Sequence, residues 1–194
     1  MPRTLNHNAL TTRRNHKDNA VVAKQPRRQA DWVLVDISGS TAAQVKGLFS
    51  NENGPRRIDC INEALNNLGT DVEVIAFSDG ISRERVGEYT PQGSTNFCPA
   101  FLEVQKWEPT TVIVISDGEI TDSKDECLGL AKKAAQSAVI DTIYIGPDDS
   151  NAEAFMRELA EIGHGRFRKY ESSKLSEKVQ TLLPPPAEAI VVKL

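Results

Sequence analysis

The stretch that decides the fold is WVLVDISGS, residues 32–40. Its first six residues, 32–37, are apolar apart from Asp36, and they lead directly into Ser38, Gly39 and Ser40. A continuous apolar run of this length predicts a strand that is buried on both faces, as in the middle of a parallel sheet. The polar residues then stand at the carboxyl end of the strand, where open α/β sheets bind their ligands.

Strands and helices alternate along the rest of the chain. The run 111–115 contains four β-branched aliphatic residues and predicts a second buried central strand. Apolar residues recur at helical spacing over 57–68, and Gly69 follows as a C-cap. The other expected elements are strands over 72–77, 139–145 and 166–169, and helices from 96 or 99 to 107 and over 123–138, 152–162 (capped by Asn151) and 173–183.

This alternation predicts an α/β fold with three layers, α/β/α, around a doubly wound sheet. We expect six strands, mostly parallel, with one antiparallel strand at an edge. Asp79-Gly80 reads as a hairpin turn, and the charged run 81–89 after it is the expected edge strand. Charges on an edge strand discourage pairing with a second molecule.

The two ends of the chain differ from its middle. Residues 1–30 contain seven basic side chains and one acidic one, a net charge of +6, which leaves −10 for the remainder of a chain whose total is −4. The first segment also lacks apolar periodicity. We therefore predict a basic, disordered tail over 1–29, one folded domain over 30–183, and a proline-rich tail over 184–194 that begins with three prolines.

Three segments place oxygen-bearing side chains near the ends of expected strands. They are Asp36-Ile37-Ser38-Gly39-Ser40, Gly93-Ser94-Thr95-Asn96 and Ser116-Asp117-Gly118-Glu119. If the first strand and the strand at 111–115 are neighbours, the three loops converge. They would bring together two carboxylates and three hydroxyls, a set of hard oxygen donors suited to Mg²⁺ or Mn²⁺ rather than to zinc or copper.

These motifs resemble the metal-ion-dependent adhesion site of von Willebrand factor A and integrin inserted domains. Asp36-x-Ser38-x-Ser40 is similar to the D-x-S-x-S motif of that family. Thr95 stands where the family's loop carries its ligand threonine, and Asp117 stands where the family has a strand-end aspartate. The three motifs occur in the family's order, and the resemblance covers about residues 31–183.

The resemblance implies a role for each of the five residues. Ser38, Ser40 and Thr95 would supply hydroxyl ligands to Mg²⁺, or to Mn²⁺ or Ca²⁺. Asp36 and Asp117 would bind the ion directly or through water and would orient the hydroxyls. An aspartate or glutamate of a partner protein would complete the coordination. Without a signal peptide or a disulfide pair, the chain looks like the small intracellular members of bacteria and phages, which often act beside AAA+ ATPases or in stress-response complexes.

Other interpretations remain open. Ser38 and Ser40 could cap a helix, and Asp117 could form a turn before the helix at 123–138. Asp79, Glu119 and Asp122 could be solvated or could touch the ion. The basic tail could bind nucleic acid, although it lacks aromatic residues for stacking on bases.

An enzyme is not expected. A metal-dependent phosphohydrolase of the haloacid-dehalogenase type needs an aspartate where Ser38 stands. His164 lies between two glycines and reads as a turn residue.

The sequence also bears on the compartment. No apolar run reaches the roughly 18 residues that a membrane span needs. The three cysteines, Cys60, Cys98 and Cys127, show no metal-binding or redox spacing and are expected to be reduced thiols. We therefore expect a cytoplasmic protein without a membrane partner.

Overall fold

The computed structural model describes residues 31–45, 54–68, 72–85, 87–148, 151–170 and 175–182. The predicted tails, 1–29 and 184–194, lie outside these residues. The elements in chain order are β1 (Trp32–Asp36), the 3-10 helix η1 (Gly39–Ala42), α1 (Arg57–Asn66), β2 (Glu73–Phe77), β3 (Ile81–Ser82), α2 (Phe97–Trp107), β4 (Thr111–Ser116), α3 (Lys124–Ala134), β5 (Val139–Tyr144), α4 (Asn151–Ile162), β6 (His164–Lys169) and α5 (Leu175–Leu182).

The strands form one six-stranded sheet in the order β3-β2-β1-β4-β5-β6. Every pair of neighbours is parallel except β2 and β3, which are antiparallel, so β3 is the predicted antiparallel edge strand. The strand order reverses between β1 and β4, where Val33 pairs with Ile113. The two strands that carry Asp36 and Asp117 are therefore neighbours at the switch point, as the sequence predicts.

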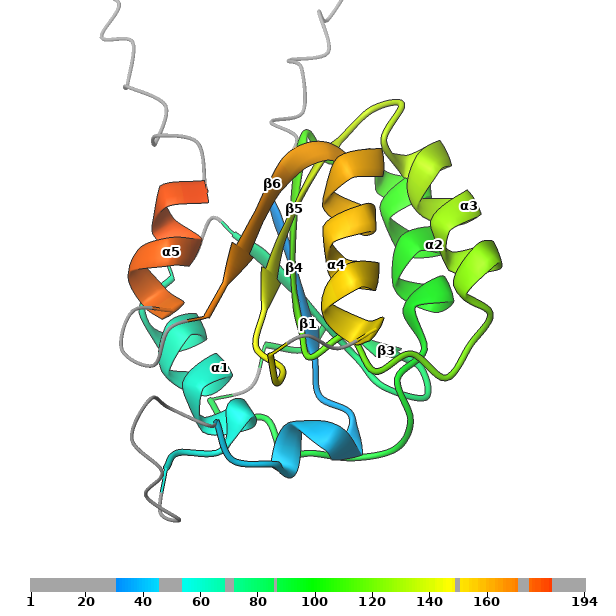
Figure 1. The fold of residues 1–194 in the computed structure, drawn as a ribbon. Coiled ribbons are helices and arrows are strands. Elements are labelled where there is room, and N and C mark those ends of the chain that lie inside the picture. Colours follow the sequence, from blue (N-terminus) through cyan, green and yellow to red (C-terminus); the bar gives the residue numbers. More distant parts are fainter. Residues whose placement is uncertain are drawn as a thin grey trace, which may run out of the picture.

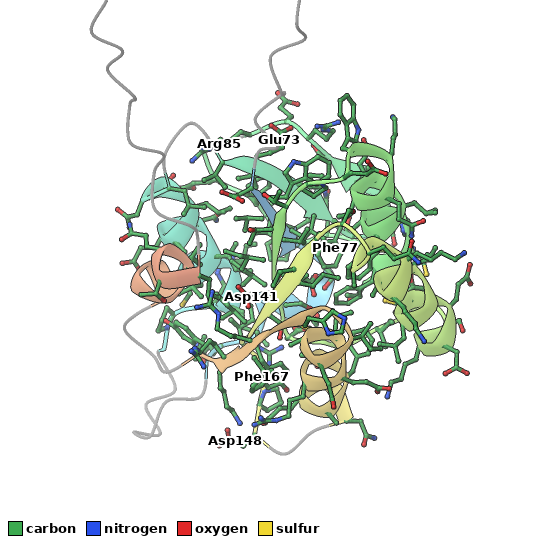
Figure 2. All side chains as sticks on the ribbon, turned by 90° about the horizontal axis from the view of Figure 1, so that it is seen from above. Glu73, Phe77, Arg85, Asp141, Asp148 and Phe167 are labelled. Atoms are coloured by element: carbon green, nitrogen blue, oxygen red, sulfur yellow. The ribbon has the colours of Figure 1, made fainter. Side chains whose placement is uncertain are left out.

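Helices cover both faces of the sheet (Figure 1). Helices α2, α3 and α4 pack on one face against alternate strand residues such as Leu34 and Val114. Helices α1 and α5 pack on the other face against the intervening residues, such as Val35 and Ile115. Both faces of β1 are thus buried, which explains its continuous apolar sequence. Figure 2 shows how the side chains fill the two layers, with Phe77 in the core on the side of α2.

The prediction of an edge strand over 81–89 is wrong in length, because β3 ends at Ser82. The next side chain, Arg83, forms ion pairs with Glu73 in β2 (3.0 Å) and Glu103 in α2 (3.1 Å). Further on, the backbone N–H of Tyr89 donates to Asn62 Oδ1 (2.8 Å) in α1. After two residues, side-chain ion pairs with β2 and α2 and a hydrogen bond to α1 therefore take the place of strand pairing.

Two helices also end earlier than expected, and the two share one reason. Helix α1 ends at Asn66 rather than residue 68, and α3 ends at Ala134 rather than residue 138. Each is followed by backbone bonds from one residue to the third before it, such as Leu68 N to Leu65 O (3.1 Å) and Ser137 N to Ala134 O (3.1 Å). These tighter turns continue the helical apolar pattern without continuing the α-helix.

Strand β6 begins at His164, two residues before the expected start. His164 has a left-handed backbone with φ of 53°. Only Gly163 separates it from α4, which ends at Ile162 as predicted from that glycine. His164 is thus both the turn residue that the sequence indicates and the first residue of the strand.

Candidate metal centre

The candidate site lies at the carboxyl edge of the sheet, at the ends of β1 and β4 (Figure 1). Backbone hydrogen bonds tie the three predicted loops together. Gly39 N donates to Gly93 O (3.0 Å), which joins the first loop to the second. Thr121 N donates to Thr95 O (3.0 Å), which joins the second to the segment after β4. The convergence expected from the sequence is therefore present.

Asp36 is the last residue of β1 and is fully buried. Its Oδ1 accepts a hydrogen bond from Ser38 N (2.8 Å), and its Oδ2 accepts one from the hydroxyl of Ser116 in β4 (2.6 Å). Burial, followed by the nearby charge of Asp117, raises the pKa of Asp36 to about 6. With both oxygens engaged, the carboxylate is fixed in one orientation and holds the loop that carries the two serines.

The hydroxyl oxygens of Ser38 and Ser40 lie 3.0 Å apart. Ser38 occupies the N-cap position of η1, but its side chain makes no capping hydrogen bond. The backbone oxygen of Ser38 accepts a bond from the hydroxyl of Thr41 (2.7 Å), so the turn is held by Thr41 instead. The capping role considered for Ser38 is therefore not what the structure shows, and its hydroxyl is directed to Ser40.

The loop that carries Thr95 has a backbone only glycine adopts easily. Gly93 has φ of 65°, and a Cβ at this position would collide with the carboxylate of Asp79. Asp79 in turn accepts a hydrogen bond from Ser94 N (2.7 Å). Thr95 itself is 3% exposed, and its backbone N–H donates to the hydroxyl of Thr121 (3.1 Å). The loop is thus clamped on both sides of Thr95.

Asp117 follows β4 directly and is fully buried. Its Oδ1 accepts a bond from Glu119 N (3.2 Å), so the turn-forming role considered for it is present. Its Oδ2 accepts a bond from Arg57 Nη1 at 2.7 Å, a buried ion pair that the sequence analysis did not predict. Asp117 therefore stabilises the turn and pairs with Arg57, and it is also a candidate metal ligand.

The donor set fits a hard divalent cation. Two buried carboxylates stand at the ends of neighbouring strands, the hydroxyls of Ser38 and Ser40 lie beside them, and the buried Thr95 is on the loop bonded to theirs. In the described part of the chain, no group of three or more His, Cys, Asp or Glu side chains could hold a metal ion. A metal at this site would consequently depend on the hydroxyls of Ser38, Ser40 and Thr95.

The other acidic residues near this edge have separate roles. Asp122 accepts a bond from Cys98 N (2.7 Å), which ties the start of α2 to the loop before α3. Glu119 is exposed, and its Oε1 lies 4.0 Å from Arg57 Nη1. Burial, with Asp122 nearby, raises the pKa of the Cys98 thiol to about 12, so this cysteine stays protonated and is a poor nucleophile. All three cysteines are free.

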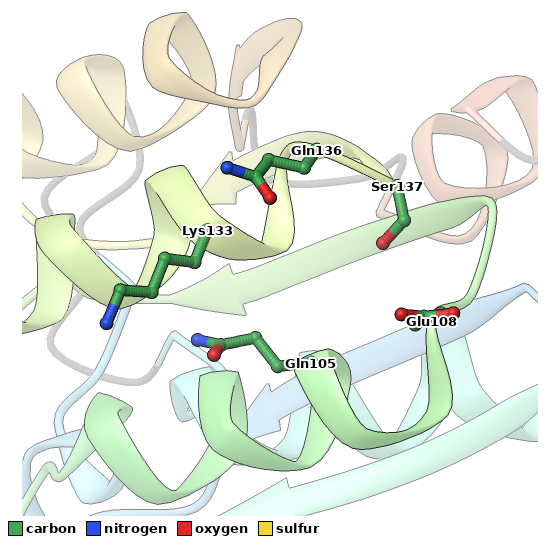
Figure 3. Close-up of a pocket in the computed structure, with 5 residues that line it drawn as sticks. All are labelled: Gln105, Glu108, Lys133, Gln136 and Ser137. Carbon is green, nitrogen blue, oxygen red and sulfur yellow. The ribbon is translucent and has the colours of Figure 1, made fainter.

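Hollows in the described surface lie both near the site and away from it. One, of about 590 Å³, adjoins the site and is lined by residues of the loop after β4 and of α4, including Glu119, Asn151 and Phe155. The other, of about 400 Å³, lies between the carboxyl ends of α2 and α3 (Figure 3). Those helix ends precede β4 and β5, so the second hollow is at the opposite edge of the sheet and is not part of the site.

Sequence reasoning missed two residues of the site, Thr121 and Arg57, and assigned no role to Ser116 of the third motif. Ser116 bonds to Asp36 across 80 positions, and no local sequence pattern predicts such a pair. Thr121 holds Thr95 from the next loop. Arg57 had a usable signal, because a basic residue in the first turn of a helix opposes the helix dipole and suggests an acidic partner elsewhere.

No protein-family model matches the sequence, and no curated protein matches it. Solved structures do match the fold, including the three that follow. A von Willebrand factor type A protein from Catenulispora acidiphila has a TM-score of 0.61 at 15% identity, covering 79% of this chain and 41% of that one. Manganese-loaded TRAP from Plasmodium vivax has a TM-score of 0.55 at 22% identity, covering 81% and 73%. The SpRpn10 VWA domain has a TM-score of 0.54 at 15% identity, covering 79% and 94%.

These matches agree with the topology. The chain spans less than half the length of the Catenulispora protein, at 41%, and nearly all of the SpRpn10 domain, at 94%. Together with the sheet order and the single antiparallel edge strand, they show that this chain has the von Willebrand factor A fold, as the sequence motifs predict. None of the helices in the described ranges is long and apolar enough to cross a membrane.

Proposed function

We propose that this chain is a metal-dependent protein-interaction module. Ser38, Ser40 and Thr95 would hold Mg²⁺, or Mn²⁺ or Ca²⁺, through their hydroxyls. Asp36 and Asp117 would act mainly through hydrogen bonds and bound water, and an aspartate or glutamate of a partner would complete the coordination. The observation that carries this proposal is the hydrogen-bonded convergence of the three loops on two buried carboxylates.

The engagement of the carboxylates supports the arrangement. Both oxygens of Asp36 already accept hydrogen bonds, and both oxygens of Asp117 accept one each. An ion held mostly by neutral hydroxyls keeps a strong attraction for an incoming anion, since little of its charge is neutralised directly. A carboxylate from a partner would then form a strong, charge-assisted contact. Manganese in the TRAP structure, which shares this fold, supports a divalent ion.

The proposal extends to the setting of the protein. A module that recognises an acidic side chain through an ion is suited to act as an adaptor or regulator in a larger complex, of an AAA+ ATPase or stress-response type. It would be a binding protein rather than an enzyme. The three free thiols support a cytoplasmic location.

The proposal is tested with the full chain and two serine variants. Ser40→Ala removes one proposed hydroxyl ligand. Ser94→Ala is the matched control, since it removes an exposed hydroxyl from the neighbouring loop, where the backbone N–H rather than the side chain bonds to Asp79. Mn²⁺ binding is measured by the loss of the electron paramagnetic resonance signal of the free ion. Partner capture is measured by pull-down from lysate in Mg²⁺ and in EDTA.

We expect Ser40→Ala to weaken Mn²⁺ binding about tenfold and to abolish the Mg²⁺-dependent capture, while Ser94→Ala behaves as the unmodified chain. A chain that binds no divalent ion, or a partner retained equally in Mg²⁺ and EDTA, would contradict the proposal.

A further inference from the structure

Helix α1 itself gives no reason for an arginine at position 57. It is the first residue of the helix, where the dipole disfavours a positive charge. The preceding Arg56 already completes the capping interaction, with Arg56 N donating to Asp59 Oδ2 (3.1 Å) and its guanidinium pairing with the same carboxylate. A reason for Arg57 must therefore lie outside α1.

That reason is the candidate metal centre. Only 9% of the Arg57 side chain is exposed. Its Nη1 lies 2.7 Å from Asp117 Oδ2 and 3.2 Å from the backbone oxygen of Ser40. Its Nε is buried and has no hydrogen-bond partner in the structure. A buried donor without a partner is unfavourable, so the guanidinium is held at this place by the charge of Asp117.

Arg57 and a divalent ion would compete for the carboxylate of Asp117. Asp36 and Asp117 are both fully buried, and Arg57 is the cation paired with one of them. A divalent ion held by the same group of oxygens would stand close to the guanidinium and draw on the same Asp117 carboxylate. Like charges at such short range repel each other. The ion must therefore either displace Arg57 from Asp117 or bind against its charge.

We propose that Arg57 is an internal cation that stabilises the metal-free site by neutralising Asp117, and that it lowers the affinity of the site for a divalent ion. This inference rests on the proposed function in one respect, that the five predicted residues are where the ion binds. It goes beyond that function by assigning the residue that sets the metal affinity. The site would be occupied only when metal, or metal with a partner carboxylate, overcomes the internal pair.

Three variants of the full chain test the inference. Arg57→Gln removes the charge but keeps a polar side chain, and Arg57→Lys keeps the charge. Arg56→Gln is the matched control. It removes the same charge from the neighbouring residue, where the arginine forms an exposed ion pair with Asp59. The dissociation constants for Mg²⁺ and Mn²⁺ are measured by calorimetry without any partner. Thermal unfolding is measured in EDTA.

We expect Arg57→Gln to bind both ions about tenfold more tightly or better, since a charged neighbour at 4–6 Å changes the affinity for a proton by about tenfold or more. The same variant should unfold at a lower temperature in EDTA. Arg57→Lys and Arg56→Gln should bind the ions within about threefold of the unmodified chain. If Arg57→Gln binds metal equally or more weakly, the inference is overturned.

The outcomes separate this inference from the proposed function. Equal metal binding by the unmodified chain and Arg57→Gln leaves the proposed function standing and overturns the role of Arg57. Binding by Arg57→Gln alone supports the role of Arg57 and overturns metal dependence in the unmodified chain. Absence of binding in both overturns both.

If Arg57→Gln does not fold, the unmodified chain still decides the matter. The nuclear magnetic resonance signal of Arg57 Nε–H, identified by its loss in Arg57→Lys, must shift as Mg²⁺ binds. An unchanged signal in the metal-bound protein overturns the inference.

Discussion

The hydroxyl of Ser116 donates a hydrogen bond to the carboxylate of Asp36 across the two central strands, with 2.6 Å between Ser116 Oγ and Asp36 Oδ2. The same oxygen of Ser116 accepts a bond from Gly118 N (2.8 Å). One side chain therefore orients the carboxylate at the end of β1 and shapes the turn that carries Asp117. The two halves of the candidate metal centre are coupled through this residue.

Ser116→Ala should destabilise the protein by about 1–3 kcal/mol, because it leaves an oxygen of Asp36 and the N–H of Gly118 buried without a partner. It should also weaken divalent-ion binding, since Asp36 loses its orientation. Urea unfolding and metal calorimetry measure the two effects. Ser137→Ala, at an exposed turn before β5, should change stability by less than about 0.5 kcal/mol. Equal effects of the two substitutions would contradict the coupling.

Two glycine substitutions should have opposite signs. Gly118 has φ of 70°, and a Cβ there would lie 2.6 Å from the backbone oxygen of Ala152 in α4. Gly118→Ala should therefore cost about 1–2 kcal/mol or more and shift the loop after Asp117. Gly129, in α3, has open space around it, and Gly129→Ala should stabilise by about 0.5–1 kcal/mol. Denaturant unfolding of both variants checks the signs, and destabilisation by Gly129→Ala would be the contrary result.

Glu153 in α4 should give pH-dependent stability. Its carboxylate pairs with Lys169 (2.6 Å) and Arg157 (2.7 Å), and these contacts lower its pKa. A group with a lowered folded pKa stabilises above its ordinary pKa and loses this effect as the pH falls through the folded value. Glu153→Gln should thus be less stable than the unmodified chain at pH 7, by about 1 kcal/mol, with the difference shrinking in acid.

The control for this measurement is on the same helix. Glu158 pairs with Lys124 at 2.8 Å, but about half of each side chain is exposed. Glu158→Gln should change stability by less than about 0.5 kcal/mol at either pH. Denaturant unfolding at pH 7 and in acid distinguishes the two positions, and a difference for Glu153→Gln that does not depend on pH would refute the assignment.

Removal of the basic tail should leave metal-dependent capture unchanged. The five proposed site residues lie within 36–117, and the +6 charge of residues 1–30 contributes only nonspecific attraction to acidic partners. A pull-down in Mg²⁺ with a chain beginning at residue 30 tests this. Loss of capture on deletion, together with a steep dependence on salt, would favour the alternative of nucleic-acid binding through the tail.

The sequence by itself determined the class of fold and the candidate donors. Buried parallel strands need apolar residues on both faces, so β1 and β4 could be predicted from their continuous apolar runs. The alternation of these runs with helical patterns left few possible topologies. Asp36, Ser38, Ser40 and Asp117 were predicted as ligands because their motifs come directly at strand ends, and Thr95 because its motif stands between them in the order of the family that they resemble. These are local signals, carried by neighbouring residues.

Only the tertiary structure decided how those donors are held and what opposes a metal. Arg57 reaches Asp117 across 60 positions, and Ser116 reaches Asp36 across 80. The end of β3 at Ser82 and the ion pairs that Arg83 forms with β2 and α2 likewise appear only in the folded chain. Pairing, burial and charge compensation depend on which side chains the packed chain brings together. Periodicity in the sequence does not indicate which residues far apart along the chain become neighbours.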